Sequence, residues 1–151
     1  HEIVADAEFE AQSCMRQVHL LSCDECTITG APELLRSAIE NIIRNGIRYT
    51  PESSAVEVSL LCEQRDGKPH AMVRFRDHGP GVPEDLINDI FRPFYRVADD
   101  RDRQTGGVGL GLAIAQQAVR LHGGTIVATN APDGGFVVEI DLPATAGISE
   151  T

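Results

Sequence analysis

The chain has few basic residues, and its apolar runs are short. Its 13 Lys and Arg residues face 23 Asp and Glu residues, for a formal net charge of −10. Such an acidic surface argues against general binding to nucleic acid or to anionic membranes. No apolar run is long enough to span a bilayer, and no basic segment precedes an apolar one as in a signal peptide. The chain starts at His1 without a methionine, so we expect a fragment or a processed product.

A complete set of zinc or redox ligands is also missing. Cys23 and Cys26 form one C-x-x-C, but neither a second C-x-x-C nor a His-x₃₋₅-His pair accompanies it. The two acidic residues between these thiols disfavour the thiolate, which a redox motif needs. We therefore expect Cys14, Cys23, Cys26 and Cys62 to be ordinary reduced cysteines, with a metal site or a disulfide as the less favoured alternative.

The composition that remains is that of one globular domain. The 151 residues are 42% hydrophobic and 24% charged, which is typical of soluble proteins with a core. There is no internal repeat and no linker between domains. We expect a single domain over residues 1–151 with its core over about 9–143.

Hydrophobic periodicity predicts the order of helices and strands. Helices are expected over residues 1–13, 31–50, from 83 onward and over 109–121. Strands are expected at 18–21 and 27–29, and hairpins over 56–75 and 125–142. Phe9 is one of the apolar positions of the first helix. This order favours an α+β fold, with a sheet that has helices on one face.

The long helix has a polar stripe opposite its isoleucines. Asn41, Asn45 and Arg48 follow at i, i+4 and i+7, so they lie on one face. An amide oxygen is a suitable ligand for Mg²⁺ that already carries phosphate oxygens and water, and an arginine can reach phosphate. Taken alone, the stripe is slightly better explained as a solvated helix face.

A second motif, Asp77-His78-Gly79-Pro80-Gly81, follows a predicted strand. A carboxylate at a strand end can accept a hydrogen bond from an exocyclic amine such as that of adenine. The glycines let the backbone pass close to a flat base. A glycine-rich turn with a capping aspartate is an equally good interpretation of this motif alone.

Two further motifs lie downstream. The segment Phe91 to Arg96 combines aromatic residues, which favour core packing, with an arginine that can stabilise phosphate charge. The segment Gly106 to Gly111 contains four glycines directly before a helix. Their N–H groups and the positive end of the helix dipole suit a phosphate group.

In this order and spacing, the motifs resemble those of the catalytic, ATP-binding domain of bacterial sensor histidine kinases, a member of the wider ATPase group of gyrase and Hsp90. Residues 41–45 resemble the N box, 77–81 and 107–111 the two glycine boxes, and 91–96 the F box. Residues 6–12, 90–96 and 98–103 more narrowly resemble Cpx-type envelope-stress kinases. The resemblance implies a two-layer α/β sandwich, with a mixed sheet of about five strands under three helices and an ATP lid at about 97–106.

The resemblance also implies roles for single residues, with ATP and Mg²⁺ as ligands. Asn45 would be the Mg²⁺ ligand, supported by Asn41. Asp77 would bind the adenine amine, in a pocket shaped by Gly79 and Gly81.

Other residues would contact the remainder of the nucleotide. Tyr49 would lie against the base, and Arg48 and Arg96 would contact phosphates, so that Asn45 and the two arginines form the catalytic set. The phosphate tail would meet backbone N–H groups of Gly107, Gly109, Leu110 and Gly111. Gly46 departs from the family, where alanine is usual, and is expected to loosen the long helix by up to about 1 kcal/mol.

One position separates kinases from ATPases within this group. Hydrolytic members have a glutamate as the base for water where this chain has Asn41, and a neutral amide cannot deprotonate water. Glu40 is next to it, but one residue turns about 100° around a helix, so its side chain should point elsewhere. We therefore expect ATP to be held for transfer rather than hydrolysed.

In this family the acceptor is a histidine on a separate helical dimerisation domain, which this chain lacks. We expect a monomeric fragment that does not phosphorylate itself, from the cytoplasmic part of a bacterial inner-membrane protein, with a response regulator as an indirect partner. The alternatives are a nucleotide-binding interaction module without transfer and an anti-sigma-type serine kinase. A structural protein without nucleotide would require the motifs to coincide by chance.

Overall fold

The helices and strands follow the expected order along the chain. The computed structural model describes residues 1–93 and 111–145. Its helices are α1 (Glu2–Gln12), α2 (Pro32–Tyr49), the 3₁₀-helix η1 (Glu84–Phe91) and α3 (Gly111–Leu121). Its strands are β1 (Gln17–Cys23), β2 (Ala55–Arg65), β3 (Lys68–Asp77), β4 (Thr125–Asn130) and β5 (Phe136–Pro143).

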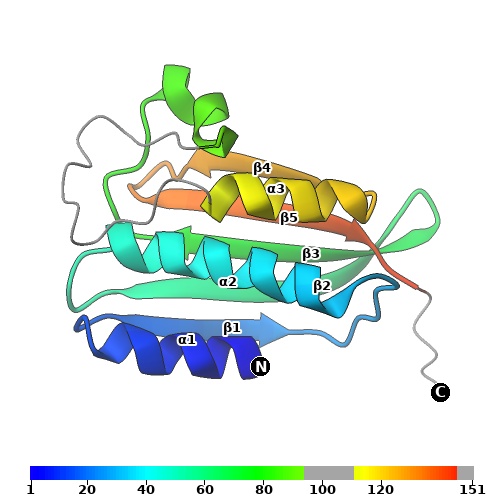
Figure 1. The fold of residues 1–151 in the computed structure, drawn as a ribbon, viewed down its shortest axis with the longest axis horizontal. Helices are drawn as coiled ribbons and strands as arrows, with labels where there is room; N and C mark the ends of the chain where they lie inside the picture. The colour runs from blue at the N-terminus through cyan, green and yellow to red at the C-terminus, as the bar shows by residue number, and fades with distance from the viewer. Residues whose placement is uncertain (94–110, 146–151) are drawn as a thin grey trace.

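One mixed sheet forms a layer, and the α-helices cover one of its faces (Figure 1). The strand order is β1-β2-β3-β5-β4, so β5 lies between β3 and β4 although it follows both in sequence. β1 pairs with β2 in parallel, whereas the other three pairs are antiparallel. The α+β class, both predicted hairpins and the five-stranded mixed sheet are therefore confirmed.

The core lies between α2, α3 and the sheet. Ile42, Ile43 and Ile47 recur at helical spacing on α2, and all three are buried. The facing strands alternate buried and more exposed residues, with Val56 and Val58 of β2 turned towards the helices. Asn41, Asn45 and Arg48 of the predicted polar stripe are half-buried, so they lie at the margin of this core.

Close approach of α2 to β2 explains the glycine at position 46. A Cβ atom at Gly46 would lie 3.0 Å and 3.2 Å from the two methyl carbons of Val56, which is tighter than an ordinary contact. Val56 is itself only 1% exposed, so it has little room to move. The glycine that costs α2 helix propensity thus lets the helix lie close to the sheet.

His122, the residue directly after α3, caps the start of α2. The N–H of Ala31 donates to Nε2 of His122 at 2.9 Å, and His122 Nδ1 lies 2.8 Å from the Ala118 carbonyl oxygen. This pattern is that of a neutral imidazole with its proton on Nδ1. This hydrogen bond connects the start of α2 to the end of α3, in addition to the packing of the two helices in the core.

Phe9 was expected among the apolar positions of the first helix, but it does not face the core. Its exposed fraction is 80%, whereas Ile3, Ala7 and Ala11 of the same helix are partly or fully buried. Those three residues recur every fourth position, and Phe9 lies about 200° around the helix from Ala7. An apolar residue therefore faces solvent on α1.

Two further elements differ from the expectation. Residues 27–29 form no strand: Thr27 makes only an isolated bridge with Thr145, because the segment runs past the sheet rather than along it. The helix expected from Pro83 is a 3₁₀-helix over Glu84–Phe91, the tighter form that is common in short connecting helices. The predicted start of the last helix at 109 lies outside the described residues.

Candidate functional site

A buried carboxyl marks the end of β3. Asp77 is only 5% exposed, and its Oδ1 accepts the N–H of Gly79 at 2.8 Å. Burial raises the pKa of this carboxyl, and the N–H groups of Gly79 and Phe136 offset part of the rise. The carboxyl is thus buried and held by a hydrogen bond at the end of β3.

A small cavity between α2 and the sheet brings two of the predicted site residues together. Its volume is about 10 Å³, roughly the room that one water molecule needs. Asn45 from α2 and Asp77 from β3 both line it, and most of the other lining residues are apolar, among them Ile42, Phe75, Phe136 and Val138. Asn45 and Asp77, which are 32 positions apart in the sequence, thus converge on one cavity, which Arg76 also lines.

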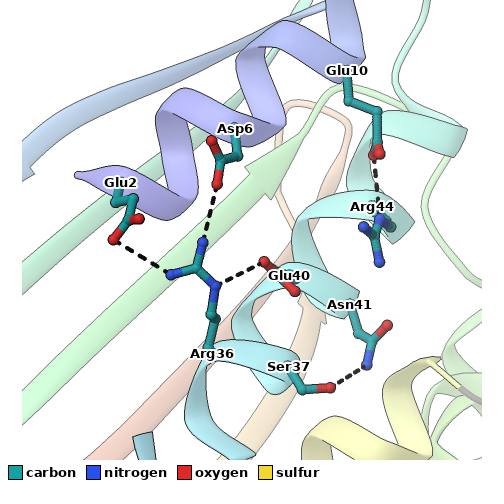
Figure 2. A network of polar contacts seen from close by, with 8 residues as sticks. All are labelled: Glu2, Asp6, Glu10, Arg36, Ser37, Glu40, Asn41 and Arg44. Carbon is teal, nitrogen blue, oxygen red and sulfur yellow. Dashed lines mark hydrogen bonds and ion pairs between the residues drawn. The ribbon is translucent and has the colours of Figure 1, made fainter. Parts of the chain in front are cut away.

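The other predicted residues of α2 lie near this cavity along the same helix. Asn41, Arg48 and Tyr49 are all half-buried, and the Arg48 guanidinium carbon lies 6.0 Å from the centre of the Tyr49 ring. Nδ2 of Asn41 lies 3.5 Å from Ser37 Oγ, which directs the amide oxygen away from that hydroxyl (Figure 2).

The loop after Asp77 passes so close to α2 that there is no room for a side chain at Gly79, the first glycine of the motif 77–81. A Cβ atom at Gly79 would lie 2.4 Å from the Tyr49 carbonyl oxygen and 3.2 Å from Asp77 Oδ1. Gly81 has a φ of 78°, and a Cβ atom there would lie 2.5 Å from Asn130 Oδ1. Both glycines are therefore required by the local structure, whether or not a ligand binds.

Thr50 is a site residue that sequence reasoning missed. Its side chain is fully buried, and Oγ1 accepts the N–H of His78 at 3.1 Å and lies 2.7 Å from Ser54 Oγ. Its carbonyl oxygen accepts Nε–H of Arg16 at 2.7 Å. The residue thus joins the end of α2 to the loop after β3. The sequence predicts only that Thr50 lies at the end of the helix, before Pro51. A single threonine forms no pattern from which its partners could be predicted.

Gly135 was predicted only as part of a turn, but it packs against the site. Its φ is 99°, and a Cβ atom would lie 2.3 Å from the Asp77 carbonyl oxygen. The hairpin that joins β4 and β5 therefore presses directly on the start of the loop 77–82. The signal available in the sequence was the Gly134-Gly135 pair directly before a strand.

Part of the predicted site lies in or next to the segment that is not described. Gly111 begins the described part of α3, and a Cβ atom there would be 3.7 Å from Asn41 Cβ, an ordinary contact between α3 and α2. The glycine-box helix therefore starts beside the polar stripe of α2. Arg96, Gly107, Gly109, Leu110 and the predicted lid at 97–106 lie outside the described residues.

Ion pairs join the outer face of α2 to α1 (Figure 2). The guanidinium of Arg36 lies 3.5 Å from a Glu2 oxygen, 3.0 Å from an Asp6 oxygen and 3.2 Å from Glu40 Oε2, and Arg44 pairs with Glu10 at 3.2 Å. Glu40 therefore points towards α1 and not along the stripe that contains Asn41 and Asn45. Its predicted direction is confirmed.

The four cysteines are free thiols, as expected. Burial, followed by the neighbouring Cys62 and the charge of Asp24, raises the pKa of the Cys26 thiol to about 12. The acidic neighbour has the predicted effect, but burial has the larger one. In the described parts of the chain, no group of three or more His, Cys, Asp or Glu side chains could hold a metal ion.

The residues of this rim of the sheet lie within a stretch of the chain that matches a known family. The family model described as "Histidine kinase-, DNA gyrase B-, and HSP90-like ATPase" matches residues 30–146, which include α2, the loop 77–82 and the start of α3. The chain belongs to this ATPase family. The sensor histidine kinase CpxA of Escherichia coli K12 is 38% identical over 143 residues, which are 94% of this chain and 30% of that protein. The resemblance to Cpx-type kinases is confirmed.

Solved structures of this ATPase family agree. The mycobacterial sensor histidine kinase MprB superposes with a TM-score of 0.78 at 26% identity, over 97% of this chain and 95% of that one. The ATP binding domain of PrrB from Mycobacterium tuberculosis superposes with a TM-score of 0.71 at 28% identity, over 96% and 93% of the two chains. The chain spans less than a third of the length of its curated relative CpxA. Across residues 1–93 and 111–145, no helix is long and apolar enough to cross a membrane.

Proposed function

We propose that this chain binds Mg-ATP at the rim formed by α2, the loop 77–82 and the start of α3, and presents the γ-phosphate for transfer to a histidine. The observation that supports this most directly is that Asn45 and Asp77 line one cavity together. Asp77 is only 5% exposed, so its carboxyl is shielded from solvent there. The carboxyl of Asp77 would accept a hydrogen bond from the exocyclic amine of adenine, and Asn45 would lie nearer the phosphates of the bound nucleotide. The ATP-binding domain of PrrB has the same fold, which also supports the assignment.

The residues present fit a magnesium ion that arrives with the nucleotide. The described chain supplies amide oxygens from Asn41 and Asn45 but no cluster of three or more His, Cys, Asp or Glu side chains. Mg²⁺ commonly takes only one or two protein ligands and completes its shell with phosphate oxygens and water. We assign Asn45 as the protein ligand and Asn41 as its support. The bound ion would neutralise phosphate charge during transfer.

Transfer is favoured over hydrolysis because no carboxylate lies on the amide stripe along the described helix α2 (Pro32–Tyr49). Asn41 occupies the position where a glutamate would activate water, and Glu40 is paired with Arg36 on the other side of α2. The phosphate would therefore go to an acceptor side chain rather than to water. Arg48, and Arg96 from outside the described residues, would stabilise the charge of the transferring group.

The acceptor would be a histidine on a helical dimerisation domain of a longer sensor kinase. We propose that residues 1–151 belong to a single catalytic, ATP-binding domain of a two-component sensor kinase, in its cytoplasmic portion. Its relative CpxA is named a sensor histidine kinase, and this chain matches 30% of its length. The remaining length is where sensing and acceptor segments would lie.

Calorimetric titration with a non-hydrolysable ATP analogue tests the proposal. We expect wild-type binding to strengthen with Mg²⁺, and Asn45→Ala to lower the Mg²⁺-dependent affinity at least about tenfold. Asn88→Ala, at an exposed asparagine of η1, is the matched control and should leave the affinity unchanged. A folded wild-type chain that binds no nucleotide would contradict the proposal, and so would equal affinity for the Asn45→Ala variant.

A further inference from the structure

Asp77, Phe136 and Asn130 form a row across three neighbouring strands, at the end of the sheet where the proposed site lies. Asp77 of β3 pairs with Phe136 of β5, and Phe136 pairs in turn with Asn130 of β4. The loop 77–82 begins at the first strand of this row and crosses the ends of the others. Asn130, the last residue of β4, therefore lies where the far end of the loop must be fixed.

Asn130 holds that far end through its side-chain amide. Its Oδ1 accepts the N–H of Val82 at 2.9 Å, and its Nδ2 donates to the carbonyl oxygen of Val82 at 2.6 Å. Both polar backbone groups of one loop residue are thus satisfied by one side chain, as a neighbouring strand would satisfy them. The amide also donates to Glu84 Oε2 at 3.0 Å, so the clamp extends to the first residue of η1.

Two glycines of the loop pack closely against their surroundings. The Gly81 backbone is so close to Asn130 that a Cβ atom would lie 2.5 Å from Oδ1, and Gly79 is equally close to the Tyr49 carbonyl oxygen, at 2.4 Å. The loop is therefore held from the α2 side at Gly79 and from the β4 side at Val82. Asp77, the last residue of β3, directly precedes this loop.

We propose that Asn130 is a positioning residue that fixes the base-binding loop and thereby sets the preference for adenine over other bases. The inference rests on the proposed function, because it assumes that the base lies against Asp77 and the loop 77–82. Asn130 acts through Val82 and the loop backbone and not by touching the nucleotide. A mispositioned loop would lose the base-specific contact while phosphate contacts from α2 and α3 remain.

Asn130→Asp is the informative variant because it keeps the size of the side chain. The acceptor for the Val82 N–H is retained, but an oxygen replaces the amide donor and faces the Val82 carbonyl oxygen and the Glu84 carboxylate. Asn88→Asp is the matched control, since it adds the same charge at an exposed position of η1. The measurement is the ratio of ATP to GTP affinity, in which a general effect of added negative charge cancels.

We expect Asn130→Asp to lower the ATP-to-GTP affinity ratio about tenfold, and Asn88→Asp to leave it unchanged. Exchange of the Val82 amide hydrogen, measured in the wild type and in the variant, is the second readout and should be faster in Asn130→Asp. If Asn130→Asp does not fold, Asn130→Ser takes its place. Slow exchange of the Val82 amide hydrogen in the wild type, together with a lowered ATP-to-GTP affinity ratio in Asn130→Ser, then supports the proposal. An unchanged ratio in Asn130→Ser overturns it.

The outcomes separate the two proposals. A wild-type chain that binds ATP, with an unchanged ratio in folded Asn130→Asp, would overturn the role of Asn130 alone. Equal loss of ATP and GTP affinity would also overturn it, because that result indicates general damage to the site. A folded wild type that binds no nucleotide would overturn the proposed function, and the role of Asn130 with it.

Discussion

The loop 77–82 and the contact between α1 and α2 both depend on polar groups, but one is buried and the other is exposed. The loop is held by hydrogen bonds to Asp77, Thr50 and Asn130, of which the first two are almost fully buried. The α1–α2 contact is held by ion pairs around Arg36, whose side chain is 35% exposed, with Glu2 at 80%. Two helices and a loop are thus fixed by different physical means.

The difference indicates which region tolerates change. A buried donor or acceptor that loses its partner keeps the full cost of leaving water, whereas an exposed ion pair exchanges its partner for solvent and salt. We therefore expect the loop 77–82 to tolerate substitution poorly. We expect the ion pairs between α1 and α2 to weaken as ionic strength rises, although α1 also packs on the core through Ile3, Ala7 and Ala11.

The largest expected effect is that of Gly79→Ala. The new Cβ atom would lie 2.4 Å from the Tyr49 carbonyl oxygen, a backbone atom that cannot rotate away. We expect a loss of about 3 kcal/mol in the free energy of unfolding, measured by urea denaturation. Gly67→Ala is the control: its φ is 77° but nothing lies within 4 Å, so only about 1 kcal/mol of backbone strain is expected. Equal losses in the two variants would contradict this interpretation.

A smaller loss is expected for Thr50→Val, which keeps the shape of the side chain. The N–H of His78 and the hydroxyl of Ser54 lose the Thr50 Oγ1 atom as partner. We expect a loss of about 1–2 kcal/mol that is the same at low and high salt, because no net charge is removed. The measurement is thermal unfolding in about 0.05 M and about 1 M NaCl. A loss that vanishes in salt would count against a buried hydrogen-bond network.

Asp77→Asn is expected to change stability in the opposite direction. Burial raises the pKa of the Asp77 carboxyl, so the folded chain keeps this proton to a higher pH than the unfolded chain does. The wild type therefore loses stability as pH rises above the ordinary carboxyl pKa of about 3.9, until the raised pKa is passed.

The asparagine does not titrate, so Asp77→Asn should be more stable than the wild type at neutral pH and equal to it in acid. Urea denaturation of both chains between pH 3 and pH 8 measures the difference. Affinity for adenine nucleotide should fall at the same time, because the carboxylate acceptor is lost. A variant that is less stable at pH 7 than at pH 3, relative to wild type, would refute the assigned direction.

The smallest effect is expected for Arg36→Met, which removes the centre of the exposed cluster. The ion pairs with Glu2, Asp6 and Glu40 are lost, but all these groups are open to solvent. We expect a loss of stability below that of Thr50→Val, and we expect it to disappear in about 1 M salt, where charges are screened within roughly 3 Å. Arg120→Met, at an exposed arginine of α3, is the control. A salt-independent loss would show that Arg36 contributes through packing.

Periodic and glycine-containing segments were the parts that the sequence could predict. The isoleucines of α2, the alternation in β2 and β3 and the turn at Asp66-Gly67 repeat over several residues, so each pattern is supported many times. The same is true of the motif order, which led to Asn45 and Asp77 and to the family. The structure shows both side chains lining one cavity, and their roles towards nucleotide stay predictions.

Single residues that act across the sheet were beyond the reach of sequence reasoning. Asn130 and Thr50 each stand alone at the end of an element, and their partners are 48 and 28 positions away. Phe9 was misplaced because its residue type suggested burial, while its position on α1 pointed outward. In these cases the tertiary contacts decide, and no local pattern records them.

The position of β5 in the middle of the sheet has a consequence for synthesis of the protein. A ribosome releases the chain from its N-terminus, at about 5–20 residues per second. The hairpin of β2 and β3 can pair as soon as it emerges, but β4 pairs only with β5, which comes later. For about a second, β3 and β4 both present unpaired edges. Because Phe136 of β5 stands between Asp77 and Asn130, the row of these three residues forms only when that last described strand is in place.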